Sequence, residues 1–198
     1  MTYDTVVFDN DGVLVGRTRF DVLRDATRNA FEECGVEEPD PDDVEQMTIG
    51  ATPGSVGTVC QTYDLDPGSF WRTRDDVVSR AQQQEAREGR KTPYDDLDEL
   101  QDLDVEMGIV SSNQQATVDF LVDHFDGFER MGAAYGREPT IHSLQLRKPN
   151  PTTSSRHSAT LTRATRCSSA TTSPTSARPR TRESTPRSSA GRTAATGS

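Results

Sequence analysis

Apolar positions along the first 150 residues alternate between strand-like runs and helix-like spacings. Residues 5–8 form a short β-branched run that is typical of a buried parallel strand. Over residues 20–34 the apolar side chains fall on one helical face, which predicts a helix that ends at Gly35. Pro39 and Pro41 indicate a loop after that helix.

Further helices and strands follow in the same region. The spacings predict helices over 55–63 and 69–88, a short helix near 95–103, a strand over 105–110, a helix over 113–125 and a weaker strand over 128–135. Trp71 and Val78 are expected to face inward. This order predicts an α/β fold, in which a Rossmann-like parallel sheet core carries an α-helical cap. We expect residues 1–15 and 95–151 to form the core and residues 16–94 to form the cap.

The pattern changes after Pro151. Residues 152–198 contain mostly Ser, Thr, Arg, Ala and Pro, with no aromatic residue and no apolar periodicity. Such a composition is typical of a disordered segment, because it cannot bury enough apolar area to offset the entropy of ordering. We therefore expect a disordered basic tail.

The sign of the net charge also changes after Pro151. Residues 152–198 carry a net charge of +7, whereas residues 1–151 carry a net charge of −17. Lys91 and Lys148 are the two lysines of the whole chain. An acidic surface with so few lysines is typical of a protein from a halophilic cytoplasm, where concentrated salt screens self-repulsion. The acidic body also argues against nucleic acid as a partner.

The cysteines and the apolar runs indicate the cellular compartment of the protein. The three cysteines lack a CxxC spacing, which favours reduced thiols in a cytoplasm. No apolar run reaches membrane-spanning length, and the first residues lack the basic and apolar regions of a secretory signal. We therefore expect a cytoplasmic protein with no membrane partner.

Two carboxylates follow the first predicted strand. Asp9 and Asp11 flank Asn10, and Gly12 allows the chain to turn away after them. This alternation lets the backbone direct both acids at one point. Two acids there suit covalent phosphoryl transfer with a divalent cation, in which one carboxylate attacks phosphorus and the other transfers a proton.

Three segments together resemble the motifs of the haloacid dehalogenase superfamily, most of whose members are phosphatases. They are Phe-Asp-Asn-Asp-Gly-Val-Leu at residues 8–14, Gly-Ile-Val-Ser-Ser-Asn at 108–113 and Lys-Pro-Asn-Pro at 148–151. About ninety residues separate the first two motifs, which leaves room for the α-helical cap of the phosphoglycolate-phosphatase-like subgroup. The resemblance covers residues 1–151.

The resemblance implies a role for each acid. Asp9 would be the nucleophile that forms an aspartyl-phosphate. Asp11 would protonate the leaving alkoxide and then deprotonate the water that breaks the intermediate. The Asp9 carboxylate and the backbone carbonyl of Asp11 would hold Mg²⁺, a cation that prefers oxygen ligands.

The second and third motifs would bind the phosphoryl group. Ser111 would donate a hydrogen bond to a phosphoryl oxygen, with Ser112 as the alternative hydroxyl and the N–H groups of Ser112 and Asn113 assisting at a helix start. Lys148 would neutralise charge that otherwise repels the Asp9 carboxylate from the phosphate. Two simpler interpretations stay open: Ser111 as a helix N-cap only, and Lys148 as a solvated side chain.

The fourth motif of the superfamily is missing. It is a Gly-Asp with a second acid four positions after the first, it completes the metal ligands, and no such sequence follows Lys148. We interpret residues 152–198 as an out-of-frame translation that begins near Pro151. If one nucleotide was lost there, the codons of residues 169–175 permit Val-Gly-Asp-x-x-x-Asp, which has the spacing of the missing motif.

These residues leave three interpretations of the chain open. We expect a Mg²⁺-dependent phosphatase that acts on a small phosphorylated metabolite through an aspartyl-phosphate and that is impaired by the loss of the fourth motif. A phosphosugar mutase of the same superfamily also keeps Asp11 and would need a bisphosphate activator, whereas a dehalogenase would lack that acid. The third alternative is a truncated product without function.

Sequencing the gene across the codon for Pro151 tests the frame hypothesis. The alternative frame should stay open over the region that encodes residues 152–198, because it would once have encoded the later strands of the core. A stop codon that interrupts this frame would contradict the hypothesis.

Overall fold

The computed structural model describes residues 4–146. The predicted tail at residues 152–198 and the candidate site residue Lys148 lie outside the described residues. Within residues 4–146, no helix has both the length and the apolar character that crossing a membrane requires.

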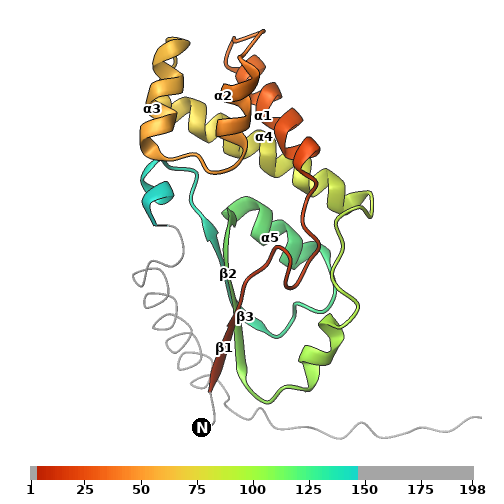
Figure 1. Ribbon diagram of the computed structural model, residues 1–198. Coiled ribbons are helices and arrows are strands. Elements are labelled where there is room, and N and C mark those ends of the chain that lie inside the picture. The colour runs from red at the N-terminus through yellow and green to blue at the C-terminus, as the bar shows by residue number, and fades with distance from the viewer. Residues whose placement is uncertain (1–3, 147–198) are drawn as a thin grey trace, which may run out of the picture.

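Three parallel strands form one sheet in the order β1–β2–β3 (Figure 1). They are β1 (Thr5–Phe8), β2 (Glu106–Gln114) and β3 (Met131–Arg137). The register of the first pair sets Phe8 beside Ile109. Because the strands are parallel, this register brings two carboxyl ends that lie about a hundred residues apart in sequence to one edge of the sheet.

Four α-helices lie between β1 and β2 in sequence, and they gather beyond the carboxyl edge of the sheet (Figure 1). They are α1 (Phe20–Glu33), α2 (Pro41–Thr48), α3 (Pro53–Thr62) and α4 (Pro67–Arg87). The remaining helical segments are α5 (Gln115–His124), which connects β2 to β3, and the short 3-10 helices η1 (Leu97–Asp102) and η2 (His142–Gln145). The predicted parallel α/β fold with a helical insertion is confirmed, and the domain boundaries stay a prediction.

Side-chain caps mark the beginning of three of the inserted helices, α2, α3 and α4. The Asp40 carboxylate accepts the N–H of Asp42 (2.8 Å), and Pro41 is the first residue of α2. At α3, Thr52 and Ser55 form a capping box in which each side chain accepts the other residue's N–H. The prediction of a loop at Pro41 was therefore wrong, because a proline in the first turn of a helix has no N–H that needs a partner.

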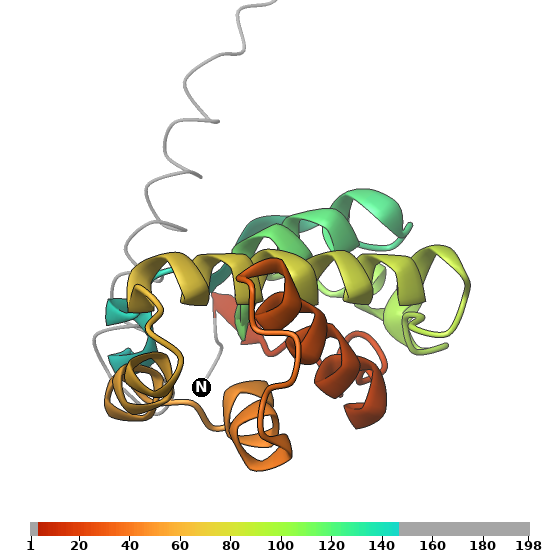
Figure 2. The same ribbon diagram turned by 90° about the horizontal axis from the view of Figure 1, so that it is seen from above.

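Apolar clusters stabilise the helical insertion and the sheet, and a small one around Ala30 and Val78 lies between α1 and α4. One cluster has buried side chains from all four inserted helices, and Phe31, Met47 and Trp71 are among them. Another packs α5 on the sheet around Ile109 and Leu121. Seen from above, α4 lies between α1 and α5, and it contacts both (Figure 2). One helix therefore joins the insertion to the sheet layer.

The second strand is longer than the sequence pattern predicts. It continues through Gln114, which pairs with Arg137 of β3, so α5 begins at Gln115 and not at Asn113. Ser111 is consequently not a helix N-cap: Gln114 occupies that position, and its side chain makes no capping hydrogen bond. The apolar pattern stops at residue 110 because the last residues of β2 carry polar side chains.

Candidate active site

The turn after β1 folds back on its own backbone. The carbonyl of Asn10 accepts the N–H of Val15 (3.1 Å), and the N–H of Gly12 donates to the carbonyl of Val15 (2.7 Å). Gly12 has a φ of +83°, which favours glycine, and a Cβ there would lie 2.6 Å from Nε of Arg17. Glycine is therefore required for the turn that carries Asp11.

The two acids of this turn lie in different surroundings. Asp9 is exposed, and one of its carboxylate oxygens accepts the N–H of Asn10 (2.9 Å). The side chain of Asp11 is 26% exposed, and each of its oxygens has a different donor. Lys91 Nζ donates to Oδ1, and Asn113 Nδ2 donates to Oδ2 at 2.9 Å. The Asp11 carboxylate is thus held from two sides.

Lys91 is a site residue that the sequence analysis did not identify. Its side chain is fully buried, it forms an ion pair with Asp11, and its Nζ also donates to the carbonyl of Gly16 (2.8 Å). A buried ammonium requires such partners, because moving an unpaired ammonium out of water costs on the order of 5 kcal/mol. The available signal was its rarity: apart from Lys148, every other basic side chain except histidine is arginine.

Ser111, Ser112 and Asn113 lie at the end of β2, beside the turn after β1. Ser111 is 8% exposed, and its Oγ accepts the N–H of Asn113 (3.1 Å). Ser112 is exposed and lines the cavity described next. The prediction that Ser112 and Asn113 start a helix was wrong, because both are strand residues. The side chain of Asn113 instead contacts Asp11.

A cavity of about 480 Å³ lies between the carboxyl edge of the sheet and the inserted helices. Asp11, Ser112 and Asn113 line it on the sheet side. Its other charged lining residues are Arg17, Arg74 and Arg137. Arg74 and Arg137 share the buried carboxylate of Asp75, so three guanidinium groups face two carboxylates here, a small excess of positive charge, although the chain has a net charge of −10. Such a cavity attracts an anionic ligand.

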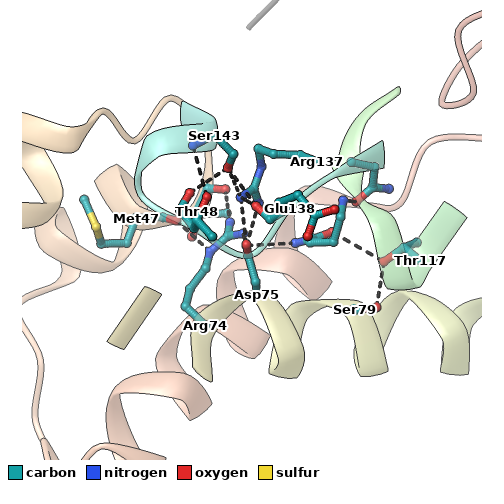
Figure 3. A network of polar contacts seen from close by, with 12 residues as sticks. Met47, Thr48, Arg74, Asp75, Ser79, Thr117, Arg137, Glu138 and Ser143 are labelled. Atoms are coloured by element: carbon teal, nitrogen blue, oxygen red, sulfur yellow. Dashed lines mark hydrogen bonds and ion pairs between the residues drawn. The ribbon is translucent and has the colours of Figure 1, made fainter. Parts of the chain in front are cut away.

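Polar contacts join one face of α4 to the sheet layer (Figure 3). Asp75 is 2% exposed and accepts hydrogen bonds from Arg137 of β3 (2.6 and 2.7 Å) and from Arg74 (3.1 Å). One turn later, Ser79 accepts the hydroxyl of Thr117 in α5 (2.8 Å). Buried polar groups with partners of this kind favour one arrangement of the helix on the sheet.

Gln82 continues this row of contacts as far as the acid. It is 3% exposed, and its side-chain amide exchanges two hydrogen bonds with that of Asn113 (2.8 and 2.9 Å). Since Asn113 also donates to Asp11, a continuous set of hydrogen bonds runs from the inserted helix to the turn after β1.

The described residues do not complete a magnesium site. The Asp9 carboxylate and the Asp11 carbonyl are oxygen donors of the kind that Mg²⁺ prefers. The carboxylate of Asp11, however, is engaged by Lys91 and Asn113. Over residues 4–146, no group of three or more His, Cys, Asp or Glu side chains could hold a metal ion. The two aspartates could therefore supply only part of a ligand set.

Replacing Asp11 should destabilise the protein far more than replacing Asp9. Asp11→Ala leaves the buried ammonium of Lys91 without its counter-ion, and we expect the free energy of unfolding to fall by about 3 kcal/mol. Asp9→Ala removes an exposed group and should cost less than about 1 kcal/mol. Urea unfolding in molar KCl measures both. The double variant Asp11→Ala/Lys91→Met should recover part of the loss, and equal losses for the two single variants would contradict the argument.

Several solved structures resemble this chain at low sequence identity. A Bacteroides fragilis protein assigned as a haloacid dehalogenase-like hydrolase is 19% identical over 81% of this chain and 74% of its own, with a TM-score of 0.53. A predicted phosphoglycolate phosphatase of Haemophilus somnus is 17% identical over 76% and 68%, with a TM-score of 0.48. A predicted phosphatase of Clostridium acetobutylicum is 15% identical over 70% and 63%, with a TM-score of 0.45. The chain thus spans less than two thirds of the Clostridium protein, and the Bacteroides likeness shows the fold.

The sequence itself identifies the family. No curated protein matches the chain. Residues 6–162, however, match the family described as haloacid dehalogenase-like hydrolase. This span contains the turn after β1, the end of β2 and Lys148. The chain belongs to the haloacid dehalogenase-like hydrolase family.

Proposed function

We propose that this protein is a Mg²⁺-dependent phosphatase that hydrolyses a small phosphorylated metabolite through an aspartyl-phosphate. The main support is the meeting of Asp11 with Ser112 and Asn113 at neighbouring strand ends, where they line one cavity with an excess of guanidinium groups. A hydrolase family and an anion-attracting cavity both suit a phosphate ester.

The two acids would divide the chemistry. Asp9 is exposed directly after β1, two residues before Asp11, although it is not among the residues that line the cavity. A bond forms between an Asp9 oxygen and phosphorus as the bond to the leaving oxygen breaks, and Asp11 donates a proton to that oxygen. Asp11 then takes a proton from the water that attacks phosphorus, which releases inorganic phosphate and restores the Asp9 carboxylate.

Hydroxyl and cationic groups would hold the phosphoryl oxygens. Ser111 and Ser112 are both candidates, the first with a buried hydroxyl and the second in the cavity lining. Lys148 would supply an ammonium from outside the described residues. Arg17 is a further candidate, because its guanidinium lies over Gly12 and makes no hydrogen bond or ion pair within residues 4–146.

A magnesium ion would be held by the Asp9 carboxylate and the Asp11 carbonyl. When bound, the ion would neutralise negative charge on the phosphoryl group. The other ligands would come from the fourth motif, which the chain as written lacks. We therefore propose that residues 152–198 impair the activity of this product.

Asp9→Asn should abolish any phosphatase activity. With p-nitrophenyl phosphate and Mg²⁺ in molar KCl, we expect kcat to fall by about a thousandfold or more, because an amide is not a nucleophile for phosphorus. Asp4→Asn is the matched control, since Asp4 is an exposed acid at the other end of β1. Turnover that survives in Asp9→Asn would contradict the proposed mechanism.

Restoring the reading frame should raise activity. We expect the chain as written to turn over at least about tenfold more slowly than the restored-frame protein, because incomplete metal ligation lowers affinity and rate. Both proteins would be compared on a panel of phosphorylated metabolites with Mg²⁺ in molar KCl. Activity within tenfold would contradict the impairment, and a requirement for a bisphosphate activator would assign a mutase instead.

A further inference from the structure

The side-chain amide of Gln82 is fully engaged at the boundary between α4 and the sheet. Its Nε2 donates to Asn113 Oδ1 (2.9 Å) and to Gln114 Oε1 (3.0 Å). Its Oε1 accepts from Asn113 Nδ2 (2.8 Å) and from the hydroxyl of Thr18 (3.2 Å). A glutamine that is 3% exposed, and whose amide oxygen and nitrogen both have hydrogen-bond partners, is held in one orientation.

This orientation determines which end of the Asn113 amide faces Asp11. Asn113 Oδ1 accepts from Gln82 Nε2 and from the N–H of Gln114 (2.9 Å). Its Nδ2 is therefore left to donate to Asp11 Oδ2 and Gln82 Oε1. In the flipped amide, an oxygen would face the Asp11 carboxylate and an NH₂ group would face two donors. Both contacts are unfavourable, so the pairing with Gln82 keeps a donor directed at Asp11.

We infer that Gln82 is a positioning residue for Asp11, contributed by the inserted helix α4. It acts through Asn113 and fixes the direction of Asp11 Oδ2, while Lys91 holds Oδ1. The inference rests on the proposed function in one respect, namely that Asp11 is the acid and base of the reaction. A proton donor must lie within hydrogen-bond reach of the leaving oxygen, so a change in its direction lowers the rate.

The alternative is that Gln82 only joins α4 to the sheet layer, as Ser79 does. Ser79 offers a matched control because it makes the same kind of contact one turn earlier, to Thr117. The side-chain hydrogen bonds that lead from Thr117 toward Asp11 pass through Gln114 and then through Gln82 itself. Gln84 is a second control, because it is exposed on the same helix. A positioning role and a joining role therefore predict different results for the variants.

The first measurement needs no turnover. In the full chain with ¹³C-labelled aspartate carboxyl groups, Asp11→Asn identifies the Asp11 signal by its loss. We expect Gln82→Ala and the equally large Gln82→Glu to shift that signal, since both remove the Nε2 donor. Ser79→Ala and Gln84→Ala should leave it in place. An Asp11 signal that moves no further in the Gln82 variants than in the two controls would overturn the inference.

The second measurement compares leaving groups. An alkyl phosphate needs a proton donor for its leaving oxygen, whereas p-nitrophenolate leaves without one. We therefore expect Gln82→Ala to lower kcat for an alkyl phosphate about tenfold more than for p-nitrophenyl phosphate, and Ser79→Ala to leave the ratio unchanged. A ratio unchanged in Gln82→Ala would overturn the inference. The Asp9→Asn test of the phosphatase proposal is independent, because the carboxyl signal reports on Asp11 in either case.

Discussion

The parallel pairing of β1 with β2 is the constraint on which the rest of the site depends. A parallel pair needs a long connection, and here that connection contains four α-helices and the short 3-10 helix η1. The same pairing sets the turn at Asp11 beside the end of β2, so Asn113 reaches its carboxylate at 2.9 Å. One topology therefore explains both the place of the insertion and the surroundings of Asp11. The segment that must cross over the carboxyl edge of the sheet also covers that edge.

The helix α4 makes this arrangement specific. Apolar packing holds the insertion mainly to itself. Within the described residues, Ala86 is the one buried residue of α1 to α4 in the sheet cluster, and Leu144 of η2 is the one buried residue from outside the insertion in the cluster around Phe31 and Trp71. The polar row of Asp75, Ser79 and Gln82 ties the bundle to the sheet layer. Hydrogen bonds have preferred directions, whereas apolar contacts do not, so the polar row selects one orientation of the cap helix over the strand ends.

Charge is used differently inside and outside this protein. The surface is strongly acidic, and exposed pairs such as Arg80 with Glu33 are weakened by salt screening. The pairs of Asp11 with Lys91 and of Asp75 with Arg137 are partly or fully buried, and salt screens them much less. The ion pairs around the candidate site therefore depend less on salt concentration than the exposed pairs do.

The sequence by itself determined the fold class, because apolar periodicity is local. The run at residues 5–8, the helix from Phe20 and the Gly12 turn follow from neighbouring residues, and the structure has all three. The sequence pattern was less informative where a strand carries the polar side chains of the candidate site. We expected β2 to end at residue 110, but it continues through Gln114. The helix at Pro41 was also missed, although Asp40 is a capping residue.

Only the tertiary structure decided which residues surround the acid. Lys91 and Gln82 are separated from Asp11 by most of the insertion, and no local pattern relates them to it. Their contacts arise because α4 and the segment after it return to the turn at the end of β1. The acids could be found from sequence because they occur together in one turn, whereas their partners depend on how a long crossover closes.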